Sequence, residues 1–311
     1  TYQRELPLQA TLELSYVGRV GVHNNRLVNI NQLQPGTLQK NPGINPNYLR
    51  PYGGYYSILM AINDARSRYD GLQVGVTRRF AAGLSFGLAY TYSASYDDAS
   101  LQSDLLPNSY DASNLWGRSS FDTPHVAFIN FIYELPFLKR DQSLAGRIAG
   151  GWQIAGGTQF QSGTVGTVAT GDDFAGVGPG SGVQMWNRNG EFKLTGSDRK
   201  FSEGAADQNF WFRTKNPDGS PIFTAPASGT FTTQSNRGII RQPGFQNWNI
   251  GLMKHFRIRE RQRIRFQAEA FNWINHPAWG GASTTPTSAM FGKVASKSGE
   301  RNLQLALRYS F

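Results

Sequence analysis

The chain of 311 residues contains no cysteine. It can therefore form no disulfide, no thiolate metal site and no cysteine nucleophile. It also lacks any apolar run near the roughly 18 residues that a membrane-spanning helix needs, because its longest run, VAFINFIY at 126–133, is strand-sized. Helical membrane proteins are excluded. The start, TYQRELPLQA, has no basic, apolar and small-residue sections, so we expect any secretory signal to have been removed or to lie upstream.

Apolar residues are also scarce, at 39% of the chain. That fraction is low for a large soluble core but natural where only every second residue of a strand must be apolar. Glycine, with 35 residues, and aromatics, at 13%, are abundant. The formal charge of +10 would suit nucleic acid or anionic lipid, but charge alone indicates a partner only weakly.

Apolar and polar residues alternate with the two-residue period of a β-strand in many segments. In the last segment, Leu303, Leu305, Leu307, Tyr309 and Phe311 fall on one face. We expect eight full strands, at 8–20, 71–80, 84–96, 125–135, 150–163, 245–256, 262–274 and 303–311, and a ninth stub at 1–6. The strand at 125–135 is the least regular, because Val126 and Phe128 share a face with Asn130 and Glu134.

The lengths of the strands and of their connections favour a membrane barrel. Most of the strands are longer than the about five or six residues usual in soluble sheets, and they suit the roughly nine to eleven of a tilted membrane-spanning strand. Short connections are expected near residue 6 and at 81–83, 136–143 and 257–262, and long ones at 21–66, 97–121, 164–243 and 275–299. Outer-membrane barrels have short periplasmic turns and long extracellular loops. The sequence therefore predicts an all-β, transmembrane antiparallel β-barrel in the outer membrane, with its loops extracellular and its C-terminus periplasmic.

Two cations interrupt the apolar faces of these strands. Arg78 and Lys254 each precede an aromatic residue, Phe80 or Phe256, by two positions. A cation at the bilayer midplane would cost about 2–4 kcal/mol, but only about 0–1 kcal/mol near the interface. We expect both side chains to lie at the periplasmic ends of their strands and to extend toward water.

Six stretches together resemble a known family. They are QRELPLQATLELSYVGRVG, RPYGGYYSI leading to YDGLQVGVTRRFAAGLSFGLAYTYSASYD, FDTPHVAFINFIYELPF, GGWQIAGGTQFQSG, NWNIGLMKHFRIRERQRIRFQAEAFNWINHPAW and FGKVASKSGERNLQLALRYSF. In order and spacing they resemble the C-terminal part of the barrel of TonB-dependent outer-membrane receptors of Gram-negative bacteria, in particular the Oar-like branch.

The resemblance implies a barrel of about 22 strands with a plug in its lumen, a plug domain before the barrel and a segment that contacts TonB. Residues 1–311 show eight strands and a stub, with neither plug nor TonB-contacting segment. We therefore expect the chain to be the C-terminal eight or nine strands of a larger barrel, with 164–243 as an extracellular loop excursion within it. A complete small barrel is the alternative.

The end of the chain also matches the family. The resemblance implies that a final aromatic residue, here Phe311 with Tyr309, is the signal that the barrel-assembly machinery recognises. Packing of Phe311 at the bilayer interface is a compatible alternative.

The general candidates for function are polar residues on the expected lumen face. They are Glu13, Arg19, Gln73, Arg79, Gln153, Gln159, Gln161, Arg265, Gln267 and Glu269. Such a wall could bind water, a plug or a passing solute, or it could simply satisfy the barrel interior.

The 164–243 excursion contains a second set of candidates. Its aromatics Trp186, Phe210, Trp211 and Phe212 could stack on a sugar or hold a peptide, or they could form a small core, which we favour. Asp172 and Asp173 stand in the glycine-rich stretch 171–182, which we interpret as a flexible surface loop rather than a cation site.

Other classes of function find little support. The basic run at 254–265 spans an expected turn, and we interpret it as solvated near anionic lipid headgroups rather than as a nucleic-acid site. The four histidines are scattered, and we see no nucleophile or acid-base pair, so we expect no enzyme, no cofactor and no metal. The main hypothesis is energy-dependent transport of a bulky solute across the outer membrane. The alternative is a barrel that does not transport and whose loops serve adhesion or complex assembly at the cell surface.

Overall fold

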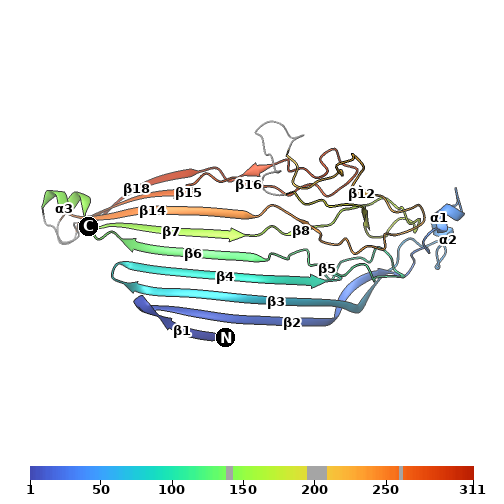
Figure 1. Ribbon diagram of the computed structural model, residues 1–311, viewed down its shortest axis with the longest axis horizontal. Coiled ribbons are helices and arrows are strands. Elements are labelled where there is room, and N and C mark those ends of the chain that lie inside the picture. Colours follow the sequence, from blue (N-terminus) through green and yellow to red (C-terminus); the bar gives the residue numbers. More distant parts are fainter. Residues whose placement is uncertain (138–142, 195–208, 259–261) are drawn as a thin grey trace.

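The computed structural model describes residues 1–137, 143–194, 209–258 and 262–311. Its main element is a ten-stranded antiparallel sheet in the order β1-β2-β3-β4-β6-β7-β14-β15-β18, with the short β5 beside β4 (Figure 1). The strands are β1 (Tyr2–Leu6), β2 (Ala10–Asn29), β3 (Leu59–Ala81), β4 (Leu84–Asp97), β5 (Gly117–Arg118), β6 (His125–Glu134), β7 (Trp152–Gln161), β14 (Phe245–Arg257), β15 (Arg263–Phe271) and β18 (Asn302–Ser310). The eight expected strands and the stub are all present.

Two strands are much longer than expected. The β2–β3 ladder continues from Arg19↔Tyr69 to Asn29↔Leu59, with register shifts between Gly21 and Asn25. His23, at this irregularity, has a φ of 57°. The expected loop at 21–66 is therefore wrong, and the loop covers only 30–58. The alternation disappears beyond Val20 because the register shifts between Gly21 and Asn25 and because polar and apolar residues then mix on both faces.

Short connections gather at one end of the sheet and long ones at the other (Figure 1). The short end has a 3-10 helix, Pro7–Gln9, and a two-residue turn at Ala82 and Gly83, both with positive φ. The turn expected at 136–143 is longer and includes the helix α3 (Leu144–Ala149), while 138–142 and 259–261 lie outside the described residues.

The long connections, residues 30–58, 98–124, 162–244 and 272–301, together form what we call the cap. They contain α1 (Thr37–Lys40), α2 (Pro46–Leu49) and the two-residue strands β8 (Val165–Gly166), β9 (Ala169–Thr170), β10 (Gln184–Met185), β11 (Asn187–Arg188), β12 (Phe223–Thr224), β13 (Ile240–Arg241), β16 (Ala278–Trp279) and β17 (Lys297–Ser298).

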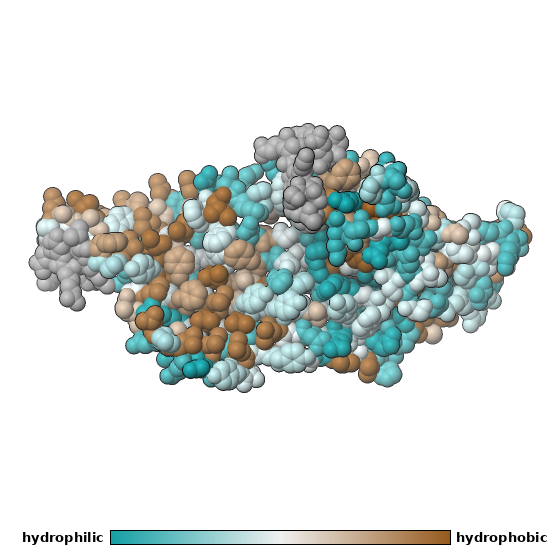
Figure 2. All heavy atoms as spheres, viewed as in Figure 1, coloured by the Kyte–Doolittle hydropathy of each residue, from teal (hydrophilic) through white to brown (hydrophobic). Residues whose placement is uncertain are grey.

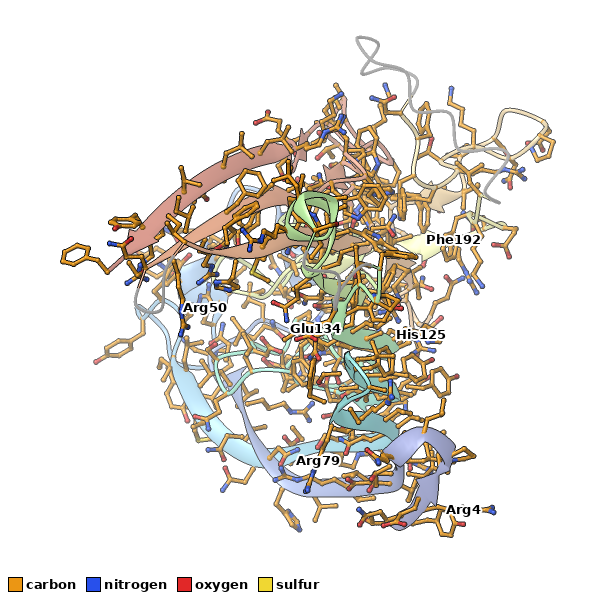
Figure 3. All side chains as sticks on the ribbon, turned by 90° about the vertical axis from the view of Figure 1, so that its left-hand side faces the viewer. Arg4, Arg50, Arg79, His125, Glu134 and Phe192 are labelled. Atoms are coloured by element: carbon orange, nitrogen blue, oxygen red, sulfur yellow. The ribbon has the colours of Figure 1, made fainter. Side chains whose placement is uncertain are left out.

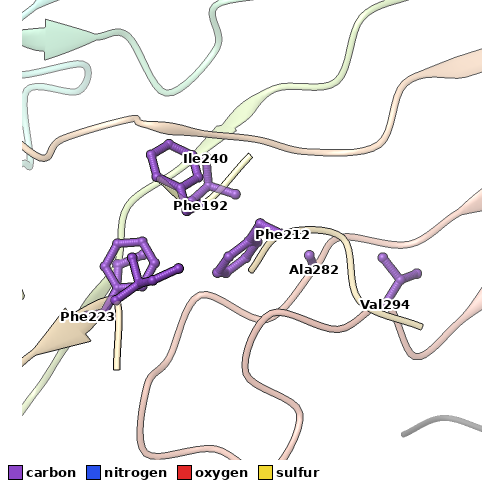
Figure 4. Close-up of a cluster of buried hydrophobic side chains, with 8 residues drawn as sticks. Phe192, Phe212, Phe223, Ile240, Ala282 and Val294 are labelled. Atoms are coloured by element: carbon purple, nitrogen blue, oxygen red, sulfur yellow. The ribbon is translucent and has the colours of Figure 1, made fainter. Parts of the chain in front are cut away.

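The hydrophobic core lies mainly in the cap rather than in the sheet. One cluster comprises Val168, Phe192, Phe212, Ile222, Phe223, Ile240, Ala282 and Val294 (Figure 4). A second contains Val28, Leu106, Leu115 and Met185. Because Ala282 and Val294 come from the connection between β15 and β18, the excursion at 164–243 packs together with its neighbour and not alone.

The sheet is curved, with a polar concave face and an apolar convex face. Viewed from its short-turn end, it shows Arg79 and Glu134 on the concave side and His125 on the convex side (Figure 3). Hydrophobic residues gather over the strands on the convex face, and hydrophilic ones over the cap (Figure 2). Leu303, Leu305 and Leu307 of β18 are each more than 70% exposed. Within the described residues, no helix is long and apolar enough to cross a membrane.

Candidate functional site

The strand register puts the polar candidates on one face. Residues that pair across strands share a face. Each strand is paired with the next from β2 and β3, with Glu13↔Gly75, to β15 and β18, with Glu269↔Gln304, so one face can be followed across the whole sheet. The pairs include Arg19↔Tyr69, Ser15↔Gln73, Phe128↔Gln159, Val126↔Gln161, Glu134↔Gln153, His255↔Arg265 and Met253↔Gln267. Arg79 lies within the register shift between Arg78 and Ala81, and its side chain is also on the concave side (Figure 3).

Two of the candidates line a polar hollow of about 600 Å³ over β1, β2 and β3. Its charged residues are Glu5, Glu13 and Arg79, and Gln3, Thr11 and Thr77 add amide and hydroxyl groups. The hollow combines acceptors and donors in an open site, which suits a polar or zwitterionic ligand better than an apolar one.

Three further candidates form a hydrogen-bonded ladder along β15. The Nη2 of Arg265 donates to Gln267 Oε1 at 2.6 Å, and the Nε2 of Gln267 donates to Glu269 Oε1 at 2.5 Å. Within the described residues, Arg265 Nε and Asn247 Oδ1 are buried without a hydrogen-bond partner. A buried polar atom left unpaired costs about 1–3 kcal/mol, so this part of the wall has hydrogen-bonding capacity for a ligand or for water.

Glu269 also lines a second hollow, of about 340 Å³, over β6, β7 and β14. Its lining combines the small residues Ala155, Gly157 and Gly251 and the amides of Asn130 and Asn249 with apolar side chains such as Ile132 and Phe271. A methyl group added at Gly157 would meet no atom within 4 Å. Asn130 and Asn249 were not predicted as site residues. Their signal in the sequence was that they fall on the polar face of their strands. The pairs Asn130↔Gly157 and Asn249↔Gly157 show that both lie on the same face as Gly157.

The structure does not bring all ten candidates together. Arg19 and Gln73 lie elsewhere along β2 and β3, and Gln153 stands opposite Glu134 toward the short-turn end. Gln161, at the cap end of β7, lines a separate hollow of about 360 Å³ with Tyr90, His125 and His276. The candidates are thus divided among separate places on the sheet, and the hollow at Gln161 also includes Tyr90 and His125 from the convex face (Figure 3).

The four aromatic candidates of the excursion are engaged in the cap itself. Phe212 is 2% exposed and makes edge contacts with Phe223 and Phe291. The other three also contact cap residues. Trp186 Nε1 donates to Thr170 Oγ1 at 3.1 Å, Trp211 Nε1 donates to Arg241 O at 2.5 Å, and Lys293 Nζ lies 5.1 Å from the centroid of the Phe210 ring.

Buried ion pairs tie the excursion to the loop between β4 and β6. Arg237 binds Asp97 at 2.5 Å, and Arg241 binds Asp122 at 2.5 Å. Arg118 also contacts Asp122, at 3.0 Å. Both carboxylates are almost fully buried. Neither aspartate was predicted from the sequence, in which their signal was only an acidic residue near a strand end.

The glycine-rich stretch 171–182 is not a loose surface loop as expected, because Ala175 and Val177 are fully buried. The Asp173 carboxylate accepts hydrogen bonds from the main-chain N–H of Val177 at 3.0 Å and of Gly178 at 2.7 Å. Nearby, Arg50 donates to Pro179 O at 2.5 Å, and burial lowers the pKa of its guanidinium. In the described part of the chain, no group of three or more His, Cys, Asp or Glu residues is arranged to hold a metal ion.

At the short-turn end, the structure describes the basic run at 254–265 except for 259–261. Lys254 is only 2% exposed, and its ammonium donates to Ile148 O at 2.7 Å and to Gly150 O. Arg78 donates to Leu8 O at 2.9 Å and to Ala81 O at 3.0 Å. The main chain of the turns therefore accepts hydrogen bonds from both cations. The expectation that Lys254 extends toward water is wrong, because its side chain is buried under these carbonyl groups.

At the C-terminus, the rings of Tyr309 and Phe311 have centroids 5.9 Å apart. Phe311 is 93% exposed.

Comparisons with known proteins agree with a barrel. The family model described as outer membrane beta barrel domain matches residues 1–304. No curated protein sequence matches the chain. Its fold is similar to that of the outer membrane transporter YddB from Escherichia coli, with 10% identity and a TM-score of 0.46 over 99% of this chain and 31% of that one.

It is also similar to two structures from Pseudomonas aeruginosa. The ferripyoverdine receptor of the outer membrane bound to ferripyoverdine has 11% identity and a TM-score of 0.39 over 97% of this chain and 25% of that one. FpvA bound to heterologous pyoverdines has 11% identity and a TM-score of 0.40 over the same shares. The chain thus spans less than a third of the length of the solved proteins it matches.

Proposed function

This chain belongs to the outer membrane β-barrel domain family, and from that premise we propose that it forms the C-terminal part of a TonB-dependent receptor barrel, of the Oar-like branch, that moves a bulky solute across the outer membrane. The family is one of outer-membrane barrels, so the chain is an outer-membrane protein. Its convex face contacts lipid, its cap is extracellular, and its C-terminus is periplasmic. Energy coupling through TonB and a plug domain follow from the sequence resemblance.

The observation that carries this proposal is the polar concave wall. A sheet that only anchored surface loops would need no hydrogen-bonding groups beyond those that satisfy its interior. Here the wall has two hollows, one of them with carboxylates and a guanidinium, and a ladder that leaves Arg265 Nε unpaired. These groups can bind and release a polar solute or a plug segment in succession.

Three finer assignments belong to the same proposal. The lumen-facing candidates bind the solute or the plug, and Tyr309 with Phe311 is the signal for the barrel-assembly machinery. Residues 1–311 act as one barrel portion, with 164–243 as an excursion that closes part of its extracellular end. The contacts between 164–243 and the loop at 98–124 support this last assignment.

Uptake by intact cells tests the proposal. The complete protein would be produced in a Gram-negative host, with and without a functional TonB system, and offered fluorescent oligosaccharides and peptides of graded size. We expect uptake that needs both the protein and TonB, and that falls several-fold in an Arg265→Met variant. Arg4→Met is the matched control, because Arg4 pairs with Leu12 on the convex face. Equal uptake without TonB would contradict the proposal.

The ordered cap supports the alternative of a surface protein that does not transport. Its two apolar clusters and buried ion pairs fix the loops in one arrangement. Four tyrosines of the loop at 30–58 are exposed, and they are Tyr48, Tyr52, Tyr55 and Tyr56. Binding of cells or proteins through these loops, with no uptake of any offered solute, would favour adhesion or complex assembly.

A further inference from the structure

The helix α3 at the short-turn end is held against the sheet in an unusual way. Isolated helices of this length do not form in water, so α3 depends on its contacts. The Ser143 hydroxyl caps its start by accepting from Gly146 N at 3.2 Å. At its end, the carbonyl of Ile148 accepts from Lys254 Nζ at 2.7 Å and from Trp152 Nε1 at 3.1 Å. Gly150 O is a further acceptor for Lys254.

These contacts fix which face of α3 points outward. Gly146 is buried, whereas Leu144 is 75% exposed and Ile148 is 58% exposed. The two apolar residues are four apart and therefore lie on the same face. Ala145 and Ala149 extend that face, and Arg147 lies to one side of it. The helix thus presents an apolar stripe, rimmed by a cation, to its surroundings.

The stripe is continuous with the lipid-facing surface of the sheet. Trp152 follows α3 directly and packs edge-on against Phe266, at 5.9 Å between ring centroids. Lys254 lies 5.3 Å from the Trp152 ring and 5.0 Å from the Phe256 ring. Trp152, Lys254, Phe266 and Leu307 form one row of paired residues on the convex face. Figure 1 shows α3 and the C-terminus at the same end of the sheet.

We propose that α3 is an interfacial helix, which lies in the boundary between acyl chains and headgroups of the leaflet at the short-turn end and so anchors the barrel at a fixed depth. Leu144 and Ile148 enter the acyl region, and Arg147 binds lipid phosphate. Lys254, whose ammonium is held by the carbonyls at the end of α3, is the positioning residue that keeps the stripe level with the lipid. This inference needs only the outer-membrane location and goes beyond the transport proposal.

A bilayer fits the stripe better than a protein partner for two reasons. First, the stripe is followed along the chain by Trp152, which packs with Phe266 on the convex face that we assign to lipid. Second, amphipathic helices with apolar residues on one side and Lys or Arg beside them are the usual form of interfacial segments. A protein docked at α3 would also have to displace lipid from Trp152 and Phe256.

Residues 1–311 contain no cysteine, so single labels can be placed there once any cysteine elsewhere in the complete protein has been replaced by serine. Single variants Leu144→Cys, Ile148→Cys and Leu101→Cys would be labelled with an NBD fluorophore and reconstituted, in the complete protein, in phosphatidylethanolamine–phosphatidylglycerol vesicles containing doxyl-labelled lipid. Leu101, an exposed residue of the cap, is the control. We expect quenching at 144 and 148 at least twice that at 101. Folding of each variant would be checked by its heat-modifiable mobility on gels.

The Lys254→Met variant tests whether Lys254 positions α3 at the lipid, or whether the apolar residues of α3 are sufficient. In Lys254→Met, the label at 144 should lose at least half of its excess quenching while the barrel remains folded. Quenching at 144 no greater than at 101, with ready access of the label to aqueous iodide, would overturn the proposal. So would protection of 144 from both quenchers, which would indicate that the stripe is covered by the protein itself and not by lipid.

Discussion

Two buried aspartates hold the cap to the end of the sheet. Asp97 closes β4, and Asp122 lies just before β6. Each binds a guanidinium from the far end of the 164–243 excursion, Arg237 or Arg241. Asp122 also accepts from the main-chain N–H of Ser95 at 2.8 Å. Because both carboxylates are buried, the stability of the cap depends on their arginine partners. An unpaired buried charge is strongly destabilising.

The Arg237→Met variant tests this dependence. It leaves Asp97 buried with no guanidinium, so we expect the cap to lose about 3–5 kcal/mol of stability. Urea unfolding in phospholipid vesicles, with protease cleavage within 162–244 as the readout, measures the loss. Arg68→Met is the control, since the Arg68–Asp70 pair is exposed to solvent and should contribute far less to stability. Equal effects of the two substitutions would contradict a buried clamp.

The cap also depends on close packing at Gly163, a glycine at the start of the excursion. A methyl group on Gly163 would collide with the main-chain oxygens of Gln242 and Pro243, at the end of the excursion. Arg241 also donates to Gly163 O, at 2.9 Å. The two ends of the excursion therefore meet at a point where no side chain fits.

We expect Gly163→Ala to destabilise the cap by about 1–3 kcal/mol, as overpacking usually does. Gly157→Ala is the matched control on the preceding strand, because its added methyl would meet open space. It should be neutral or slightly stabilising, since alanine restricts the unfolded chain. Both are measured by the same protease-monitored urea titration. A neutral Gly163→Ala would show that the ends of the excursion are not closely packed.

At the scale of the element, alternation predicted the strands where one face is apolar and the other polar, and it failed where both faces are mixed. Along β4 and β15, Leu84 to Tyr92 and Ile264 to Ala270 alternate throughout, and both strands were predicted to within a few residues. The upper parts of β2 and β3 carry polar residues on both faces. They remain strands because their ladder and side-chain contacts continue, which no local pattern indicates.

Arg26 is the residue that holds this upper hairpin. Its guanidinium binds both carboxylate oxygens of Asp64, at 2.6 and 2.5 Å. We expect Arg26→Met to speed amide hydrogen exchange in 21–29 and 59–68 by at least tenfold, and to leave 10–20 and 71–80 unchanged. Hydrogen-exchange mass spectrometry measures both regions in one experiment, with Arg19→Met on the same strand as the control. Uniform acceleration over both strands would show that the hairpin does not open as a separate unit.

At the scale of the whole molecule, the sequence predicted which face each site residue would occupy but not which residues would meet. The face follows from the two-residue period. The hollows depend on the register between strands far apart in sequence, such as Asn130↔Gly157, and on the curvature of the sheet. The cap depends on contacts between loops, such as that of Arg237 with Asp97, for which the sequence carries no periodic signal.

The assignment of lipid to the convex face and of the lumen to the concave face can be tested at two adjacent positions of β18. Leu305 pairs with Ala268 on the convex face, and Gln304 pairs with Glu269 on the concave face. An arginine at a lipid-facing midplane position costs about 2–4 kcal/mol. Leu305→Arg should therefore lower the free energy of unfolding by about that amount, as measured by urea titration in phospholipid vesicles.

Gln304→Arg is its matched control, because it adds the same side chain one residue away. On a polar wall that faces Glu269, it should change the free energy of unfolding by less than about 1 kcal/mol. Its effect should instead appear in transport, since the added cation alters the wall of the second hollow. If Gln304→Arg were the costly change and Leu305→Arg were harmless, the two faces would be exchanged. The polar wall would then lie against lipid, and no solute could pass along it.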